Sequence, residues 1–197
     1  MRNIDVNTFT PQQKTIAVNN RFGNTGIKQQ QGSTIILYDT LPLDGSTELR
    51  FFEGSAQRNF PLSNTGSDGN KLGVGNTMVI ERYYLTEVTT DADTGAKTFQ
   101  PILIGGISGV VLAEMTISVA NTEVIKKVPV LSSLPQFNKI AENQLNHSFE
   151  FDTMVVIPPL LEYVCALRLD TYTADPTKSL RLTIEGSGSI VAPRNTF

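Results

Sequence analysis

The chain has 197 residues, enough for one domain with a sizeable core, and 40% of them are hydrophobic, which excludes a compositionally disordered protein. The formal net charge of −3 argues against binding of nucleic acid through an overall positive charge, so we expect no specific nucleic-acid site. The single cysteine excludes an intrachain disulfide, and no apolar run reaches the length of about 18 residues that predicts a transmembrane segment. Because residues 1–20 lack the apolar run of a signal peptide, we expect synthesis in the cytoplasm.

Charged residues make up only 18% of the chain, below the roughly 25% that is typical of soluble domains. Thr, Ser, Asn and Gln supply the polar surface instead. Amides and hydroxyls are less costly to bury against a neighbour than charges are, so this composition hints at packing into an assembly. The same composition is also ordinary for a β protein.

Residues 1–33 are predicted to form an extended N-terminal arm. The segment is rich in Gln, Asn and Gly and shows neither the period of a strand nor that of a helix. Small apolar anchors recur through it, at Ile4, Val6, Phe9, Ile16, Val18 and Phe22. An arm that docks on a neighbouring chain needs such anchors, whereas a frayed terminus carries them only by chance.

The rest of the chain, residues 34–197, alternates between short β-rich runs and turns. Apolar and polar residues alternate most clearly in residues 113–119, which is the period of a half-buried strand. Residues 91–96, with two Asp and one Gly, have the composition of a hairpin turn. The predicted strands are residues 34–38, 48–52, 78–90, 99–104, 113–119, 123–130, 162–170 and 180–185.

One short helix is predicted over residues 134–145, where Phe137, Ile140 and Ala141 share a face and Ser133 is placed to cap the N-terminus. Pro158 and Pro159 cannot continue a sheet's hydrogen bonds, so we expect them to redirect the chain from one sheet to the other.

About eight strands with long Gly- and Pro-containing loops predict an all-β fold, an antiparallel β-sandwich. A single jelly roll over residues 34–197, preceded by the arm, is the specific prediction. An immunoglobulin-like sandwich is its nearest competitor.

Residues that could carry chemistry are few and lack partners. His147 is the only histidine, and no G-x-S-x-G motif accompanies it. Cys165 falls on the apolar side of its predicted strand, where a thiol is a poor nucleophile. Asp91 and Asp93 have calcium-loop spacing without the distal Glu, and no helix follows the glycines of residues 186–188. We assign no catalytic, cofactor-binding or metal-binding residue and expect neither an enzyme nor a cofactor.

Three segments prompt a comparison with a known family. They are MVVIPPLLE at residues 154–162, SLRLTIEGSG at residues 179–188 and LRFFEG at residues 49–54. In style and layout they resemble the jelly-roll capsid proteins of tailless icosahedral bacteriophages and viruses. The resemblance implies a structural shell subunit made in the host cytoplasm and located in the virion. It would be a homo-oligomer, with copies of itself and other virion proteins as partners.

The length of 197 residues suffices for one jelly roll, not for the double one that many such phages use in their main shell. An alternative function is a phage fibre or decoration domain, or a carbohydrate-binding β-sandwich module. That function needs aromatic side chains exposed on one face. The chain has no Trp for stacking on sugars, which leaves Tyr83, Tyr84 and Tyr172 as the candidate residues.

Overall fold

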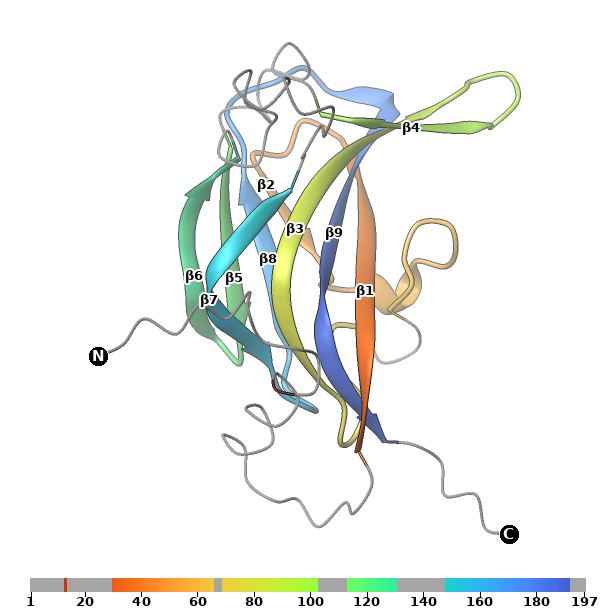
Figure 1. Cartoon of the computed structure of the whole chain (residues 1–197). Helices are drawn as coiled ribbons and strands as arrows, with labels where there is room; N and C mark the ends of the chain where they lie inside the picture. Colours follow the sequence, from red (N-terminus) through yellow and green to blue (C-terminus); the bar gives the residue numbers. More distant parts are fainter. Residues whose placement is uncertain (1–12, 14–29, 66–68, 103–112, 131–147, 192–197) are drawn as a thin grey trace, which may run out of the picture.

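The structure is a computed structural model, and it describes residue 13 and residues 30–65, 69–102, 113–130 and 148–191. Within these residues the chain forms two antiparallel sheets packed on one core, so the predicted all-β sandwich is confirmed (Figure 1). The nine strands of this described part are β1 (Gln30–Leu43), β2 (Glu48–Phe51), β3 (Thr77–Thr90), β4 (Lys97–Pro101), β5 (Glu114–Val119), β6 (Thr122–Pro129), β7 (Phe149–Ile157), β8 (Tyr163–Arg168) and β9 (Asp175–Val191).

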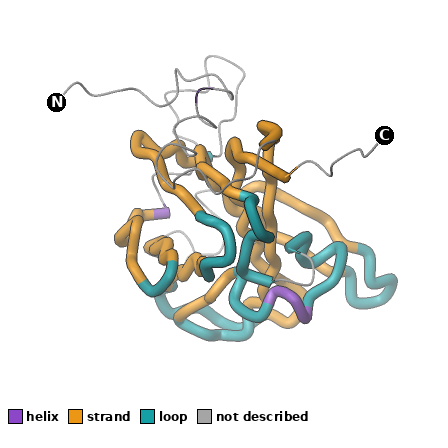
Figure 2. The backbone as a smooth tube through the Cα atoms, turned by 90° about the horizontal axis from the view of Figure 1, so that it is seen from below, coloured by secondary structure: helices purple, strands orange, loops and turns teal. Residues whose placement is uncertain are grey.

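Two of the predictions fall wholly or mostly on residues that are not described. The predicted helix at residues 134–145 lies outside the described residues, and so does most of the predicted arm at residues 1–33. β1 begins at Gln30, inside the range assigned to the arm. A single-turn 3-10 helix, η2 (Ser55–Gln57), follows β2 and lies among loops (Figure 2).

Sheet A has the order β1-β9-β3-β4, and β7 also pairs with β3. β4 pairs with the C-terminal half of β3, from Thr86 to Thr90, whereas β7 pairs with its N-terminal half, from Met78 to Tyr83. Sheet B has the order β2-β8-β5-β6. The chain crosses from β7 in sheet A to β8 in sheet B through Pro158 and Pro159, as the sequence predicts.

Strands far apart in the sequence pair in a nested order. β1 pairs with β9, β2 with β8, β3 with β7, and β5 with β6, all antiparallel. These four pairs alternate between sheet A and sheet B. The contacts β3–β9 and β5–β8 then join the pairs side by side within each sheet. The short strand β4 lies in the sequence between β3 and β5 and is not part of this nested set.

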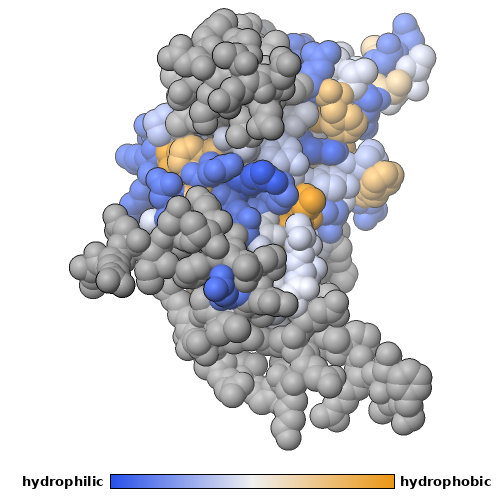
Figure 3. Space-filling model, in the orientation of Figure 1, coloured by the Kyte–Doolittle hydropathy of each residue, from blue (hydrophilic) through white to orange (hydrophobic). Residues whose placement is uncertain are grey.

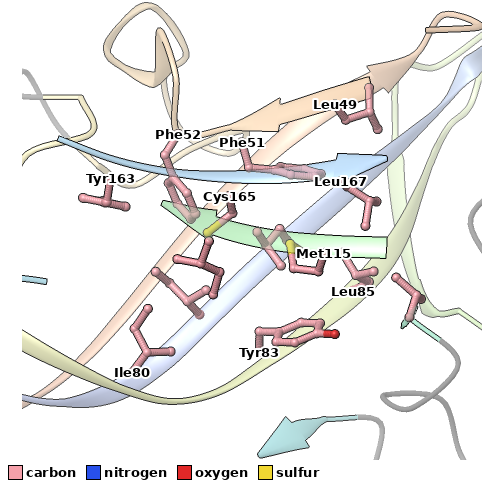
Figure 4. Packing of buried hydrophobic residues seen from close by; sticks show 14 of the residues in the cluster. Leu49, Phe51, Phe52, Ile80, Tyr83, Leu85, Met115, Tyr163, Cys165 and Leu167 are labelled. Atoms are coloured by element: carbon pink, nitrogen blue, oxygen red, sulfur yellow. The ribbon is translucent and has the colours of Figure 1, made fainter. Parts of the chain in front are cut away.

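The core fills the space between the two sheets. β5 alternates strictly, so Met115 and Ile117 point inward, and β8 does the same with Cys165 and Leu167. Figure 4 shows Met115, Cys165 and Leu167 together in the core. Sheet A meets them with buried side chains that include Leu182. Fully burying one such side chain contributes about 1.5–3 kcal/mol, so this shared core explains why the sheets stack.

A β-bulge in β3 decides which side chains enter the core. The register of β3 against both neighbours shifts between Ile80 and Arg82. Because a shift of one residue exchanges the two faces of a strand, Tyr83 points inward after the bulge. Its ring packs 5.4 Å from that of Phe149 and 5.8 Å from that of Phe151, measured between centroids.

The predicted hairpin turn at residues 91–96 is confirmed between β3 and β4. Asp91 Oδ1 accepts hydrogen bonds from the Asp93 N–H (3.0 Å), the Thr94 N–H (2.7 Å) and the Thr94 hydroxyl (2.8 Å). Gly95 supplies the positive φ of 69° that closes the turn. The whole hairpin projects from the sandwich, and residues 91–100 are all exposed (Figure 1).

Candidate functional site

The structure describes only some of the residues weighed for catalysis. Cys165 is completely buried on the inner side of β8, and burial, reinforced by the negative charge of Asp39, raises the pKa of its thiol. A buried thiol with a raised pKa is a poor nucleophile. His147 lies outside the described residues. Among the residues that are described, no group of three or more His, Cys, Asp or Glu side chains is arranged to hold a metal ion.

No helix in the described part of the chain has the length and apolar character needed to cross a bilayer. The described part of the chain presents the outward-facing surfaces of two sheets and the edges of those sheets.

A hollow of about 490 Å³ lies on the outer side of sheet B. Arg50, Ser118 and Val164 reach it from β2, β5 and β8, because each alternates along its strand with side chains that enter the core. The other lining residues come from the β5–β6 hairpin and three nearby loops: Glu53, Gly54, Asn70, Asn121, Glu123 and Glu162. The lining is polar and offers amides and carboxylates, with no histidine or cysteine.

Acidic side chains outnumber basic ones around this hollow. Arg50 donates to Glu53 and, at 3.3 Å, to Glu48, and these carboxylates raise the pKa of its guanidinium. The Lys71 ammonium lies 3.1 Å from Glu162. All these groups are about half exposed, and exposed ion pairs are worth only about 0–1 kcal/mol. An incoming cation therefore competes with these internal partners at low cost.

The outer side of sheet A carries a cation between two aromatic rings. The Arg181 guanidinium carbon on β9 lies 4.4 Å from the ring centroid of Tyr38 and 4.5 Å from that of Phe99. Its Nε donates to the Thr40 hydroxyl at 3.0 Å, and its Nη2 donates to the Pro61 carbonyl. Partial burial lowers the pKa of this guanidinium, against the opposing effect of nearby Tyr38. Cation–π contacts of this kind contribute about 0.5–2 kcal/mol.

Exposed apolar side chains surround this stacked arginine. Ile36 on β1 is 46% exposed, Phe99 on β4 is 45% exposed, and Phe60, which precedes Pro61, is 84% exposed. Figure 3 shows hydrophobic surface over β4, over β1 and on the loop beside β1, with hydrophilic surface between. We call Ile36, Tyr38, Phe60, Phe99 and Arg181 the aromatic patch. Aromatic residues and arginine are enriched in protein–protein interfaces.

The three tyrosines considered for sugar binding do not share a platform. Tyr83 is 0% exposed in the core, so its assignment to an exposed face is wrong, because the bulge in β3 reverses the alternation. The Tyr172 hydroxyl accepts a hydrogen bond from the Gly45 N–H at 3.0 Å, and its ring packs against the core. Only Tyr84 faces outward from sheet A, where it is half-buried.

Two edge strands, β1 and β6, are protected in different ways. Along β1, the Asn64 side chain accepts from the Tyr38 N–H and donates to the Ile36 carbonyl, both at 2.8 Å, so it imitates a neighbouring strand. β6 is mostly exposed, but it carries Lys126 and Lys127, and Lys127 has a positive φ of 50°. Charges and irregular backbone on an edge discourage the addition of another strand. Contacts through side-chain surfaces are therefore favoured over strand addition at these places.

Comparisons of the chain with protein-family models, with curated proteins and with solved structures found no match. The candidate surfaces accordingly rest on the residues of this chain alone.

Proposed function

We propose that this protein is a capsid subunit of a tailless icosahedral bacteriophage or virus, and that its sandwich is a single jelly roll. The observation that carries the proposal is the nested pairing β1·β9, β2·β8, β3·β7 and β5·β6, alternating between two sheets. Jelly rolls of this kind, with eight strands in two sheets, are used by viral capsid domains. They are also used by lectins, so the fold by itself does not select a function.

The surfaces favour assembly over sugar binding. The outer sides of both sheets carry features suited to protein contacts, the aromatic patch on sheet A and the hollow on sheet B. A carbohydrate-binding or fibre module remains the alternative. Its candidate tyrosines are dispersed, with Tyr83 in the core and Tyr172 packed against it.

The proposed mechanism is mechanical and involves no catalysis or cofactor. A rigid sandwich presents complementary surfaces to copies of itself and to other virion proteins, and the arm of residues 1–33 ties neighbours together. The low proportion of charged residues, 18%, reduces the desolvation cost of these contacts. The chain thus acts in the virion after synthesis in the host cytoplasm.

The test is the assembly state of the full chain. Sedimentation velocity and electron microscopy of the purified protein should show closed oligomers or shells, with about 1,200–2,000 Å² buried at each stable contact. Antibodies against the chain should label the surface or interior of particles from its natural source. A chain that stays monomeric at high concentration and is absent from such particles would refute the proposal. Glycan binding by that monomer would support the alternative module.

A further inference from the structure

The charges of this chain are divided unequally between its N-terminal segment and the remainder. Of the 16 Lys and Arg residues, four lie within residues 1–29, and of the 19 Asp and Glu residues only one does. The segment therefore has a net charge of +3, and residues 30–197 have a net charge of −6. The charged residues of the segment are Arg2, Asp5, Lys14, Arg21 and Lys28.

The hollow on the outer side of sheet B is lined by more acidic than basic side chains. Three carboxylates and a single guanidinium line it. Glu123 and Glu162 have Lys126 at 3.9 Å and Lys71 at 3.1 Å as partners, but their side chains are 57% and 61% exposed, so these ion pairs are weak. Asn70, Asn121 and Ser118 add amide and hydroxyl groups between them. A volume of about 490 Å³ is comparable to a small-ligand pocket, so it accommodates a few side chains and not a folded domain.

We propose that this hollow binds the basic arm of a neighbouring copy of the chain, through residues 19–28. Arg21 and Lys28 form ion pairs with Glu123 and Glu162. The asparagines of the same segment form hydrogen bonds with the side-chain amides of the hollow. The inference rests on the proposed function, because it names the contact by which one subunit holds the next.

The position of β1 favours a second copy as the source of Lys28. Lys28 is two residues from Gln30, which is the first residue of β1 in sheet A. Two residues span at most about 7 Å, whereas two packed sheets are already about 10 Å apart. The Lys28 backbone of the same chain therefore falls short of the outer side of sheet B, whereas Lys28 of a neighbour is not tied to this sheet A. Arg21 lies nine residues before Gln30 and has a reach of about 30 Å, so the disulfide experiment below decides which copy supplies it.

Charge reversal in the full chain tests the contact. We expect Glu123→Lys with Glu162→Lys to weaken self-association by about tenfold or more, which corresponds to about 1.4 kcal/mol. Arg21→Glu with Lys28→Glu should weaken it similarly, and the chain with all four changes should recover. The control is Asp93→Lys with Asp152→Lys, which changes the net charge equally on the β3–β4 hairpin and on β7 of sheet A. It should leave association within about threefold of wild type, and Glu123→Gln with Glu162→Gln serves if the lysine variants misfold.

A disulfide between copies identifies the donor of the arm. One chain carries Asn24→Cys and another carries Asn121→Cys, and Cys165 stays out of the reaction because it is buried. Mild oxidation of the mixture should produce an interchain dimer, and mixing Asn24→Cys with Asp93→Cys should not. Association that persists in the Glu123→Lys, Glu162→Lys chain, without the disulfide, would overturn the inference and leave the capsid proposal intact. A wild-type chain that does not associate would remove both.

Discussion

At the scale of single residues, Asp39 holds the loop that follows β2. Its side chain is completely buried, and its oxygens accept from Arg58 Nε at 2.8 Å and Arg58 Nη2 at 2.6 Å. Oδ2 also accepts from the Phe52 N–H at 2.7 Å. Phe52 has a positive φ of 70°, and its ring lies 5.2 Å from that of Tyr163 in the core. The carboxylate thus stabilises a backbone conformation that a phenylalanine rarely adopts.

Asp39→Asn should therefore be strongly destabilising. Removing one charge of a buried pair costs about 3–5 kcal/mol, and we expect about 3 because the Arg58 side chain remains 22% exposed. Urea unfolding followed by circular dichroism measures the change. The control, Glu48→Gln, removes an ion pair with Arg50 that is about half exposed, and should cost less than about 1 kcal/mol. Equal losses for the two variants would contradict this role for Asp39.

Cys165 gives a second prediction at this scale. Its pKa is raised by burial, so the thiol stays protonated through neutral and mildly alkaline pH. A thiol reagent should label the native protein very slowly and should label the unfolded protein at once. Cys165→Ser should cost about 1–3 kcal/mol, because it buries a hydroxyl among apolar side chains. Rapid labelling of the folded chain at pH 8 would show that the site opens.

At the scale of elements, β9 is the central strand of sheet A and pairs with both β1 and β3. It runs from Asp175 to Val191, although only residues 180–185 are predicted as a strand from the sequence. The strand continues through Gly186 and Gly188, where the backbone of β3 lies too close to leave room for a side chain. A Cβ on Gly186 would lie 1.9 Å from the Val79 carbonyl oxygen, and one on Gly188 would lie 2.1 Å from that of Thr77.

Gly186→Ala should accordingly cost about 3 kcal/mol or more, since the obstructing atom is backbone and cannot rotate away. Thermal unfolding measures the loss. Gly73→Ala is the matched control, because a Cβ there meets only the Asn76 side-chain amide at 3.4 Å. A Gly186→Ala chain as stable as the Gly73→Ala chain would mean that β9 moves away from β3 without cost.

The β3–β4 hairpin should be sensitive to acid. Hydrogen bonds from the Thr94 N–H and hydroxyl, and from the Asp93 N–H, lower the pKa of Asp91. These hydrogen bonds therefore stabilise the turn fully at pH values above the ordinary carboxylate pKa of about 4. The stabilisation is lost as the pH falls through the lower pKa that Asp91 has in the folded state. Amide exchange of Asp93 and Thr94, followed by NMR, should rise over that range. Asp91→Ala should raise it already at neutral pH, whereas Asp93→Asn should not.

At the scale of the whole molecule, we predict that the sandwich folds without the N-terminal arm but assembles less well. The core contains residues from both sheets, and all its buried residues that the structure describes lie between Leu43 and Ile184. Deleting residues 1–29 should leave the melting temperature within a few degrees, since no described core contact is lost. Light scattering coupled to chromatography should show weaker assembly than the full chain at the same concentration. A deleted chain that unfolds would mean that the arm belongs to its own sandwich.

Local alternation sufficed to predict the strands that have one buried and one solvated face. β5 and β8 are such strands, and so is the middle of β9, because a period of two is visible in any half-buried strand. The turn at residues 91–96 was equally predictable from the backbone preferences of Asp and Gly. The burial of Cys165 was predictable from its position in the alternation along β8.

The sequence did not predict β7, because the alternation of its apolar and polar residues is interrupted and two prolines follow it. Pairing with β3 stabilises this strand in the structure despite the weak local pattern. The position of Tyr83 in the core depends on a bulge that only the pairing of β3 with β7 and β9 creates. The hollow on sheet B could not be seen in the sequence, since its lining comes from segments between Arg50 and Val164 that meet only after the sheets form. By itself, then, the sequence determined an all-β sandwich with an amide-rich surface, because burial and turn preferences are local. Tertiary structure alone decided the nested strand order, the inward face of β3 and the acidic hollow, because these depend on pairings between distant residues.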